Sequence, residues 1–191
     1  MKFVENEFSY TLEIKRSKFI THICPYNQFN SMMKRLQEEH PKGRHFVYAY
    51  RYLNEFDQIV ENSSDDGEPK GTSGKPSLSV LRGSDIINSA VIIVRYFGGI
   101  RLGTGGLVRA YGDAVNLVLE NSEFKEYKKL ATKTLTINYD KLGQIEYLLT
   151  QEKIIIKEKE FTSDVILTLC ASKEEFESLS LQLPLGIILK D

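Results

Sequence analysis

Two glycine-rich stretches decide the fold of this chain: DDGEPKGTSGKP at residues 65–76 and RYFGGIRLGTGGLVRAY at residues 95–111. Of the 13 glycines in the sequence, ten lie between Gly67 and Gly112. Glycine is needed where the backbone turns with a positive φ or passes close to another segment. We therefore expect two tight loops here, and we expect the functional surface to lie within the stretch from Asp65 to Tyr111.

The segments around these loops predict a domain of strands and helices. The apolar run Ala90–Tyr96 between them is typical of a fully buried strand. Proline favours the first position of a helix, which predicts a short helix at Pro76–Leu81. Helical spacing predicts a second helix after the second loop, from Leu107 to about Leu119, with apolar positions at Leu107, Val108, Tyr111, Val115, Val118 and Leu119. Upstream, the pattern predicts strands at Phe8–Ile14, Lys18–Ile23, His45–Leu53 and Gln58–Asn62, and a helix that Asn27 caps and Pro41 ends.

The composition changes at Glu120, and the polar segment Asn121–Lys129 is predicted to be a linker. Beyond it the periodicity predicts strand, helix, strand, strand, helix and strand, at Thr132–Tyr139, Leu142–Thr150, Ile154–Lys159, Val165–Ala171, Glu174–Leu181 and Leu185–Lys190. This βαββαβ order is the ferredoxin-like arrangement. We therefore predict an α+β protein of two domains, residues 1–124 and residues 129–191.

The bulk composition limits the class of protein. A net charge of −1 gives no global cationic field, so a nucleic-acid role would need a local basic patch. Cys24 and Cys170 are far apart and form no C-x-x-C pair, which argues against a zinc knuckle or a disulfide framework and fits a reducing compartment. The sequence also lacks a signal-peptide pattern and an apolar run long enough to cross a bilayer. We expect a soluble cytoplasmic protein with no membrane partner.

The first stretch carries three carboxylates, Asp65, Asp66 and Glu68. They allow three interpretations: a site for a hard cation such as Mg²⁺, acid–base chemistry by a carboxylate pair, or a solvated turn, because Asp-Gly is common turn chemistry. No histidine or further acid lies at ligand spacing. We therefore predict no bound metal and no other cofactor.

The second stretch contains arginines and no acid, and its glycines precede the start of a helix. Helix N-termini offer free N–H groups and the positive end of the helix dipole, which favour anions. The predicted nucleic-acid or anion-binding residues are Arg95, Arg101, Gly103, Thr104, Gly105, Gly106 and Arg109. The alternative is a tight packing corner, since glycine serves both purposes. Two nucleotide motifs fail: Val108 stands at the third glycine of G-x-G-x-x-G, and Pro76 follows Gly74-Lys75 where a P-loop needs Ser or Thr.

Together the two stretches resemble the signature of the IMPACT family, in its bacterial YigZ-type form. In the first stretch the resemblance rests on a signature loop that includes Asp65, Asp66, Glu68, Lys70, Thr72, Ser73 and Lys75. Ser73 is a small departure, because relatives often have alanine there. The resemblance covers essentially the whole chain. It implies an N-terminal domain like the second domain of ribosomal protein S5, and a C-terminal domain similar to the ferredoxin-like last domain of elongation factor G.

The resemblance also implies a link to translation. Eukaryotic members of the family look like translation regulators, which restrain a starvation-response kinase by competing for its ribosome-associated activator. They carry an additional N-terminal interaction domain that we do not expect here, so that partner is not transferred to this chain.

The residues and the resemblance together predict a non-enzymatic protein that associates with RNA or the ribosome and regulates translation. Arg95, Arg101 and Arg109 would contact phosphate, and the Gly103–Gly106 loop would present backbone N–H donors. The carboxylates of the first stretch would order the facing loop, one of them by pairing with an arginine. Two alternatives stay open. One is a metal-assisted enzyme acting on a phosphate-bearing small molecule, and the other is a pure interaction module with a protein partner in translation.

Overall fold

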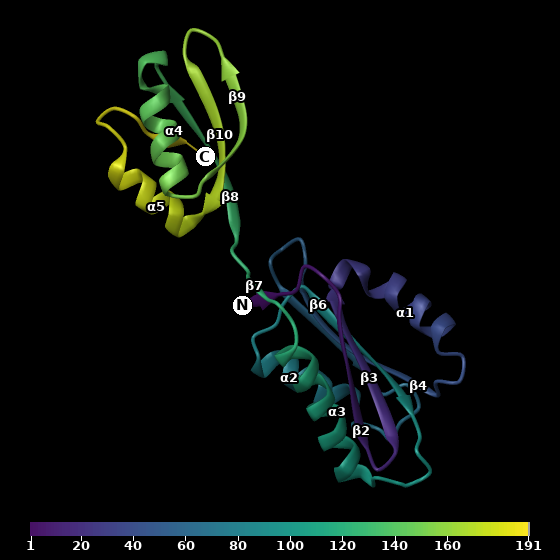
Figure 1. Ribbon diagram of the computed structural model, residues 1–191. Coiled ribbons are helices and arrows are strands. Elements are labelled where there is room, and N and C mark those ends of the chain that lie inside the picture. The colour runs from purple at the N-terminus through teal and green to yellow at the C-terminus, as the bar shows by residue number, and fades with distance from the viewer. Residues whose placement is uncertain (191) are drawn as a thin grey trace. The chain divides into compact units, whose positions relative to one another are not determined.

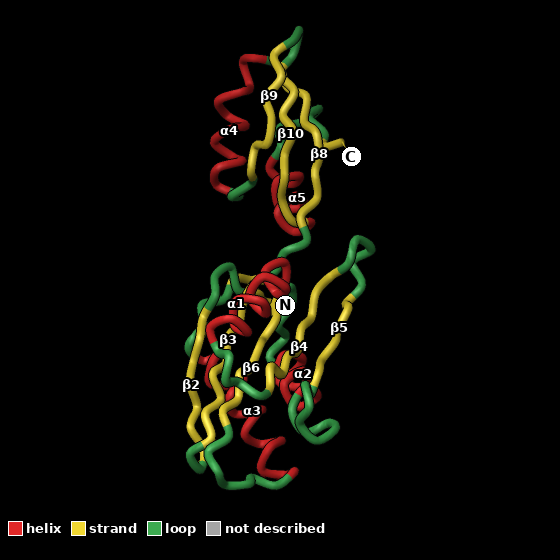
Figure 2. Tube along the Cα trace, turned by 90° about the vertical axis from the view of Figure 1, so that its right-hand side faces the viewer, coloured by secondary structure: helices red, strands yellow, loops and turns green. Residues whose placement is uncertain are grey.

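The buried strand between the two glycine-rich stretches is the centre of a sheet. In the computed structural model, which describes residues 1–190, β6 (Ser89–Tyr96) lies between β3 (Ser17–Pro25) and β4 (His45–Leu53). The five-stranded order is β2-β3-β6-β4-β5, and neighbouring strands are antiparallel. Figure 2 shows β2 (Phe8–Ile14) and β5 (Ile59–Ser64) at the two edges. The buried strand predicted at Ala90–Tyr96 is confirmed as β6.

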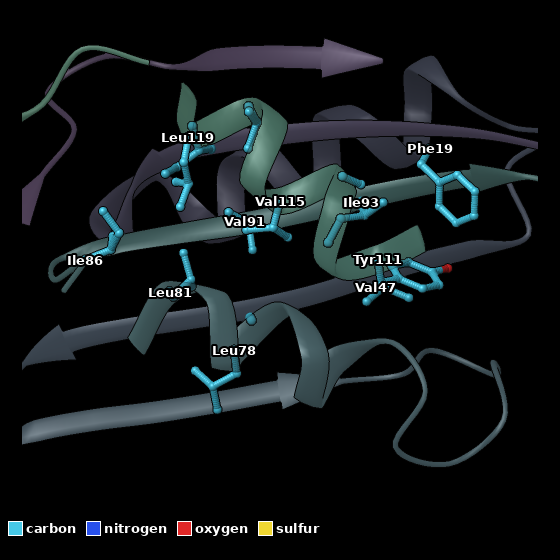
Figure 3. Packing of buried hydrophobic residues seen from close by; sticks show 14 of the residues in the cluster. Phe19, Val47, Leu78, Leu81, Ile86, Val91, Ile93, Tyr111, Val115 and Leu119 are labelled. Carbon is cyan, nitrogen blue, oxygen red and sulfur yellow. The ribbon is translucent and has the colours of Figure 1, made fainter. Parts of the chain in front are cut away.

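Helices cover both faces of this sheet, which is why the run Ala90–Val94 of β6 is apolar. Figure 1 shows α1 (Phe29–Glu39) on one face, and α2 (Gly74–Gly83) and α3 (Thr104–Glu120) on the other. Alternate side chains of the strands sort to the two faces, since successive residues point in opposite directions. Val91 and Ile93 pack with the α2 and α3 residues (Figure 3), whereas Ile92 packs with those of α1.

Three local predictions for this unit are wrong. The short helix begins at Gly74, so Pro76 is its third residue; its missing N–H is still harmless in the first turn. A 3₁₀ turn, η1 (Tyr26–Gln28), precedes α1, and its cap position is Gln28 rather than Asn27. Val108 is 40% exposed, because it lies one residue, and therefore about 100°, from the buried Leu107 on α3.

The segment predicted to be a linker contains a short strand. β7 (Lys125–Glu126) pairs antiparallel with β1 (Lys2–Phe3). The chain divides by its contacts into two units, Met1–Tyr127 and Lys128–Asp191. The first unit therefore continues through β7, and the pairing ties both of its ends together.

The second unit has the predicted order of elements. It comprises β8 (Leu130–Ile137), the 3₁₀ turn η2 (Tyr139–Lys141), α4 (Leu142–Gln151), β9 (Ile155–Phe161), β10 (Val165–Ser172), α5 (Lys173–Gln182) and β11 (Leu189–Lys190). Its sheet has the order β11-β8-β10-β9, as in a ferredoxin-like fold. Residues of α4 and α5 form one core with the strands. The last strand is shorter than predicted, because Pro184 and a positive-φ Gly186 precede it.

The predicted α+β class is confirmed by these two units. Within residues 1–190, no helix has both the length and the apolar character that crossing a bilayer requires.

Candidate anion-binding site

Both glycine-rich stretches lie at one end of the first sheet. The register pairs His45 with Arg95, Lys18 with Tyr96, and Tyr48 with Ser64. The β2–β3 turn, the start of β4, the end of β5 and the end of β6 therefore meet there. Residues 65–73 follow β5 and residues 97–103 follow β6, so the sheet itself brings the two loops to the same edge.

Asp65 closes the first loop onto the start of α2. Its carboxylate accepts hydrogen bonds from the N–H groups of Gly71 (2.7 Å), Ser73 (3.1 Å) and Gly74 (2.8 Å), and from the Ser73 hydroxyl (2.7 Å). Burial alone would raise the pKa of this carboxyl, but these hydrogen bonds outweigh it and lower the pKa from its usual value. Asp65 is therefore a fixed anion that caps the helix from nine residues upstream of Gly74.

Asp66 holds the same loop against the start of β4. Its carboxylate accepts the N–H of Phe46 at 2.5 Å, and its carbonyl lies 2.7 Å from Nδ1 of His45. Asp66 has a φ of 43°, a turn conformation that Asp tolerates better than most residues. Thr72 closes the turn further by donating its hydroxyl to the carbonyl of Pro69 at 2.7 Å.

Glu68 joins the two stretches through a buried network. Its Oε1 pairs with Nη1 of Arg95 and accepts the Tyr111 hydroxyl at 2.9 Å. The side chains of Arg95 and Glu68 are only 7% and 4% exposed. Burial and the adjacent Glu68 carboxylate raise the pKa of Tyr111, so this hydroxyl stays a neutral donor. The expected pairing between the acidic loop and an arginine is present.

Tyr111 links this network to the core. Its ring lies edge-on to Phe19 with centroids 5.1 Å apart, at one end of the apolar cluster. Figure 3 shows the hydroxyl pointing away from the aliphatic side chains. The ring therefore anchors α3 in the core while the hydroxyl reaches the site.

Gly98 brings the second loop against the β2–β3 turn. A Cβ at this position would lie 2.1 Å from the backbone carbon of Arg16, closer than any real contact. The Gly98 N–H also donates to the Ser17 hydroxyl at 3.1 Å. This glycine therefore serves close packing, whereas Gly103, with a φ of 72°, serves the turn into α3.

The start of α3 presents free donors. The helix begins at Thr104, so Thr104, Gly105 and Gly106 form its first turn and not a separate loop. Their N–H groups have no intrahelical acceptor, and the helix has neither a side-chain cap nor an acid in its first turn. Both features favour an anion at this position.

A pocket of about 390 Å³ opens at this helix start. Its polar lining residues are Arg44, His45, Glu68, Arg95, Arg101 and Thr104, and its apolar lining residues are Pro69, Phe97, Leu102 and Leu107. In residues 1–190, Nε of Arg95 is one of the buried polar atoms that have no hydrogen-bond partner. Arg95 thus forms part of the pocket wall with donor capacity that Glu68 does not use.

The predicted anion-binding residues do not all meet. Arg95, Arg101, Gly103 and Thr104 line the pocket, whereas Arg109 and Lys75 line a separate groove between α2 and α3. Arg109 Nε donates to the Gly105 carbonyl at 3.4 Å. Lys70 is exposed, and Ser73 is fully buried. The three carboxylates of the first stretch do not act as one group, because Asp65, Asp66 and Glu68 each bind a different part of the protein.

Sequence reasoning missed Arg44 and gave His45 no role beyond a strand edge. Both enter the site through the pairing of β4 with β6, which sets His45 opposite Arg95. Further exposed cations lie at the same end of the sheet, in the β2–β3 turn and before β4: Lys15, Arg16, Lys18 and Lys42. A basic end of a nearly neutral chain is the local patch that nucleic-acid binding would need.

Residues 15–119 match the Impact N-terminal domain, and residues 135–184 match a domain of unknown function, DUF1949. An IMPACT family member of Haemophilus influenzae is 38% identical over 90% of this chain and 84% of its own length. The IMPACT family member YigZ of Escherichia coli is 42% identical over 73% of this chain and 70% of its own. A crystal structure of a hypothetical protein has 33% identity and a TM-score of 0.65, covering 99% of this chain and 95% of that one. The chain therefore belongs to the IMPACT family, as its two glycine-rich stretches predict.

Proposed function

We propose that the basic end of the first unit binds RNA through phosphate groups, and that the protein regulates translation by this binding. The observation that carries the proposal is the pocket at the start of α3, where arginine side chains and unpaired helix N–H groups converge. Guanidinium groups and helix N-termini are both preferred partners of phosphate.

The arginines of the pocket have different roles in this proposal. Arg95 is held by Glu68 below the surface and shapes the pocket wall. Arg44 and Arg101 are exposed, and neither has an ion-pair partner among residues 1–190. Arg44 and Arg101 are therefore the side chains that would reach RNA first, with the Thr104–Gly106 N–H groups behind them.

The carboxylates of the first loop do not oppose this role. The Asp65 carboxylate is directed at the N–H groups of its own loop, and the charge of Glu68 is neutralised by its ion pair with Arg95. The exposed cations Lys15, Arg16 and Lys18 extend the positive surface beyond the pocket. An RNA strand at this end would thus meet mainly positive charge, which favours its association.

The proposed role in the regulation of translation is based on membership of the IMPACT family. Its eukaryotic members look like translation regulators, and an RNA-binding surface on an S5-like domain suits that setting.

The test compares two single-charge variants of the full-length chain. Arg101→Gln should weaken binding of a single-stranded RNA about three- to tenfold, since one partly exposed phosphate contact contributes roughly 1 kcal/mol. It should also reduce the slope of log K against log salt by about 0.7. Arg82→Gln is the matched control, because Arg82 pairs with Glu61 at the opposite end of the sheet. Fluorescence anisotropy at several salt concentrations measures both quantities.

An equal loss in both variants would show that only net charge matters. Wild-type protein that binds no RNA at low salt would contradict the proposal.

A further inference from the structure

The size of the pocket restricts what can enter it. Its volume of about 390 Å³ lies at the lower end of the range for small-ligand sites, roughly 300–1,000 Å³. Proteins that hold single-stranded nucleic acid along its length use sites of about 4–16 nucleotides. A pocket of this size fits one small unit and not a run of nucleotides.

The charge of the pocket restricts the ligand further. Its lining contains Arg44, Arg95 and Arg101 against the one carboxylate of Glu68, which leaves two positive charges. The start of α3 adds the positive end of the helix dipole. A phosphomonoester carries about −1.5 to −2 near pH 7, whereas an internal phosphodiester of RNA carries a single negative charge. The pocket therefore matches a terminal phosphate better than a bridging one.

Buried donor capacity supports an anion inside the pocket and not only at its rim. Arg95 is 6% exposed and lines the pocket, and its Nε has no partner within residues 1–190. An unsatisfied buried donor is costly unless a ligand or ordered water uses the site. This observation is independent of the helix start, and Arg95 and the first residue of α3, Thr104, line the same pocket.

The apolar lining of the pocket suits a flat apolar group, beside the Arg95 guanidinium that lies 5.7 Å from the centroid of the Phe97 ring. Phe97 is half exposed beside the pocket, next to Leu102 and Leu107. Bases stack on exposed aromatic rings with little dependence on sequence. A nucleotide could thus place its phosphate at Arg44, Arg101 and the Thr104 N–H while its base lies against Phe97.

We infer that the pocket binds one nucleotide through its phosphomonoester, so that RNA is held by a phosphorylated end. This inference rests on the proposed RNA-binding function and narrows its ligand. Two sources share the chemistry, a phosphorylated RNA terminus and a free nucleoside monophosphate, and the experiment separates them.

The test titrates the full-length chain with one short single-stranded RNA in three forms: with a 5′-monophosphate, with a 3′-monophosphate, and with hydroxyl groups at both ends. Adenosine monophosphate and adenosine are added as competitors. At least one phosphorylated RNA should bind about tenfold more tightly than the unphosphorylated RNA, since a charge-assisted contact is gained. Adenosine monophosphate should compete, and adenosine should not. Phe97→Ala should reduce the affinity for the phosphorylated form by about tenfold, because a stacked base is lost.

The outcomes separate the two proposals. Equal binding of all three RNAs overturns the terminal-phosphate inference and leaves RNA binding in place. Binding of adenosine monophosphate without any RNA supports the pocket ligand and contradicts the RNA function. Binding of none of the probes rejects both. A thermal melt of Phe97→Ala should match wild type, because the ring is 50% exposed.

Discussion

Replacing Glu68 by glutamine tests whether the buried network holds the two signature loops together. The substitution keeps the shape of the side chain and an oxygen for the Tyr111 hydroxyl, but it removes the charge that neutralises Arg95. The guanidinium of Arg95 would then be an unpaired cation with a 7% exposed side chain.

The expected cost follows from that burial. Breaking a buried ion pair by removing one partner typically destabilises a protein by about 3–5 kcal/mol, because the remaining charge stays desolvated. Retention of the Tyr111 hydrogen bond places Glu68→Gln at the lower end, about 3 kcal/mol. The double variant Glu68→Gln/Arg95→Met should recover part of this loss, since it removes the orphaned charge.

Urea unfolding followed by circular dichroism measures these differences in the full-length chain. The two units can unfold separately, so the transition of the first unit is identified by its shift in the Tyr111→Phe variant. Arg82→Gln is the control, because it breaks an ion pair of the same unit in which Arg82 is 55% exposed. Such an exposed pair contributes about 0–1 kcal/mol.

A Glu68→Gln variant as stable as the Arg82→Gln control would refute the reasoning. It would mean that Arg95 is solvated in solution and that the loops are held by other contacts. A double variant less stable than Glu68→Gln alone would also contradict it.

Three further predictions concern single residues. Gly98→Ala should destabilise the first unit by about 1–3 kcal/mol in the same unfolding assay, because its Cβ meets the Arg16 backbone, while Gly83→Ala, with open space around it, should not. Asp65→Asn should lower stability at pH 7 by about 1–3 kcal/mol, since the charged cap is lost. Because the pKa of Asp65 is lowered in the folded state, its carboxylate stabilises the fold at pH values above its usual pKa of 3.8. That contribution disappears as the pH falls through the folded pKa. The stability of the variant should therefore decline less than that of wild type between about pH 5 and pH 2. Burial raises the pKa of Cys24 to about 12, so native Cys24 should resist alkylation at pH 8 and react only after unfolding, as mass spectrometry would show.

The order of elements could be predicted from the sequence because it depends on local periodicity. Ala90–Val94 is uniformly apolar, and this indicates a strand covered on both faces. The βαββαβ order of the second unit follows from period and turn residues in the same way. Local caps were less predictable: Asn27 is suited to a cap, but the 3₁₀ turn moves the helix start past it.

The site was harder to predict because strand register is not visible in a sequence. The glycines and arginines of the second stretch indicated an anion site at the start of α3. Arg44 was missed because only the pairing of β4 with β6 brings it beside Arg95. Conversely, Arg109 looked equivalent to Arg101 in sequence, yet the helix turns it towards a different groove.

An NMR titration of the full-length chain with 5′-phosphorylated single-stranded RNA tests the central claim most directly. The backbone amides of Thr104, Gly105 and Gly106 are the donors to which the account assigns the phosphate. Their resonances, together with Nε of Arg101, should show the largest chemical-shift changes and saturate together. Unchanged signals at these positions while others in the chain respond to the RNA would contradict the account.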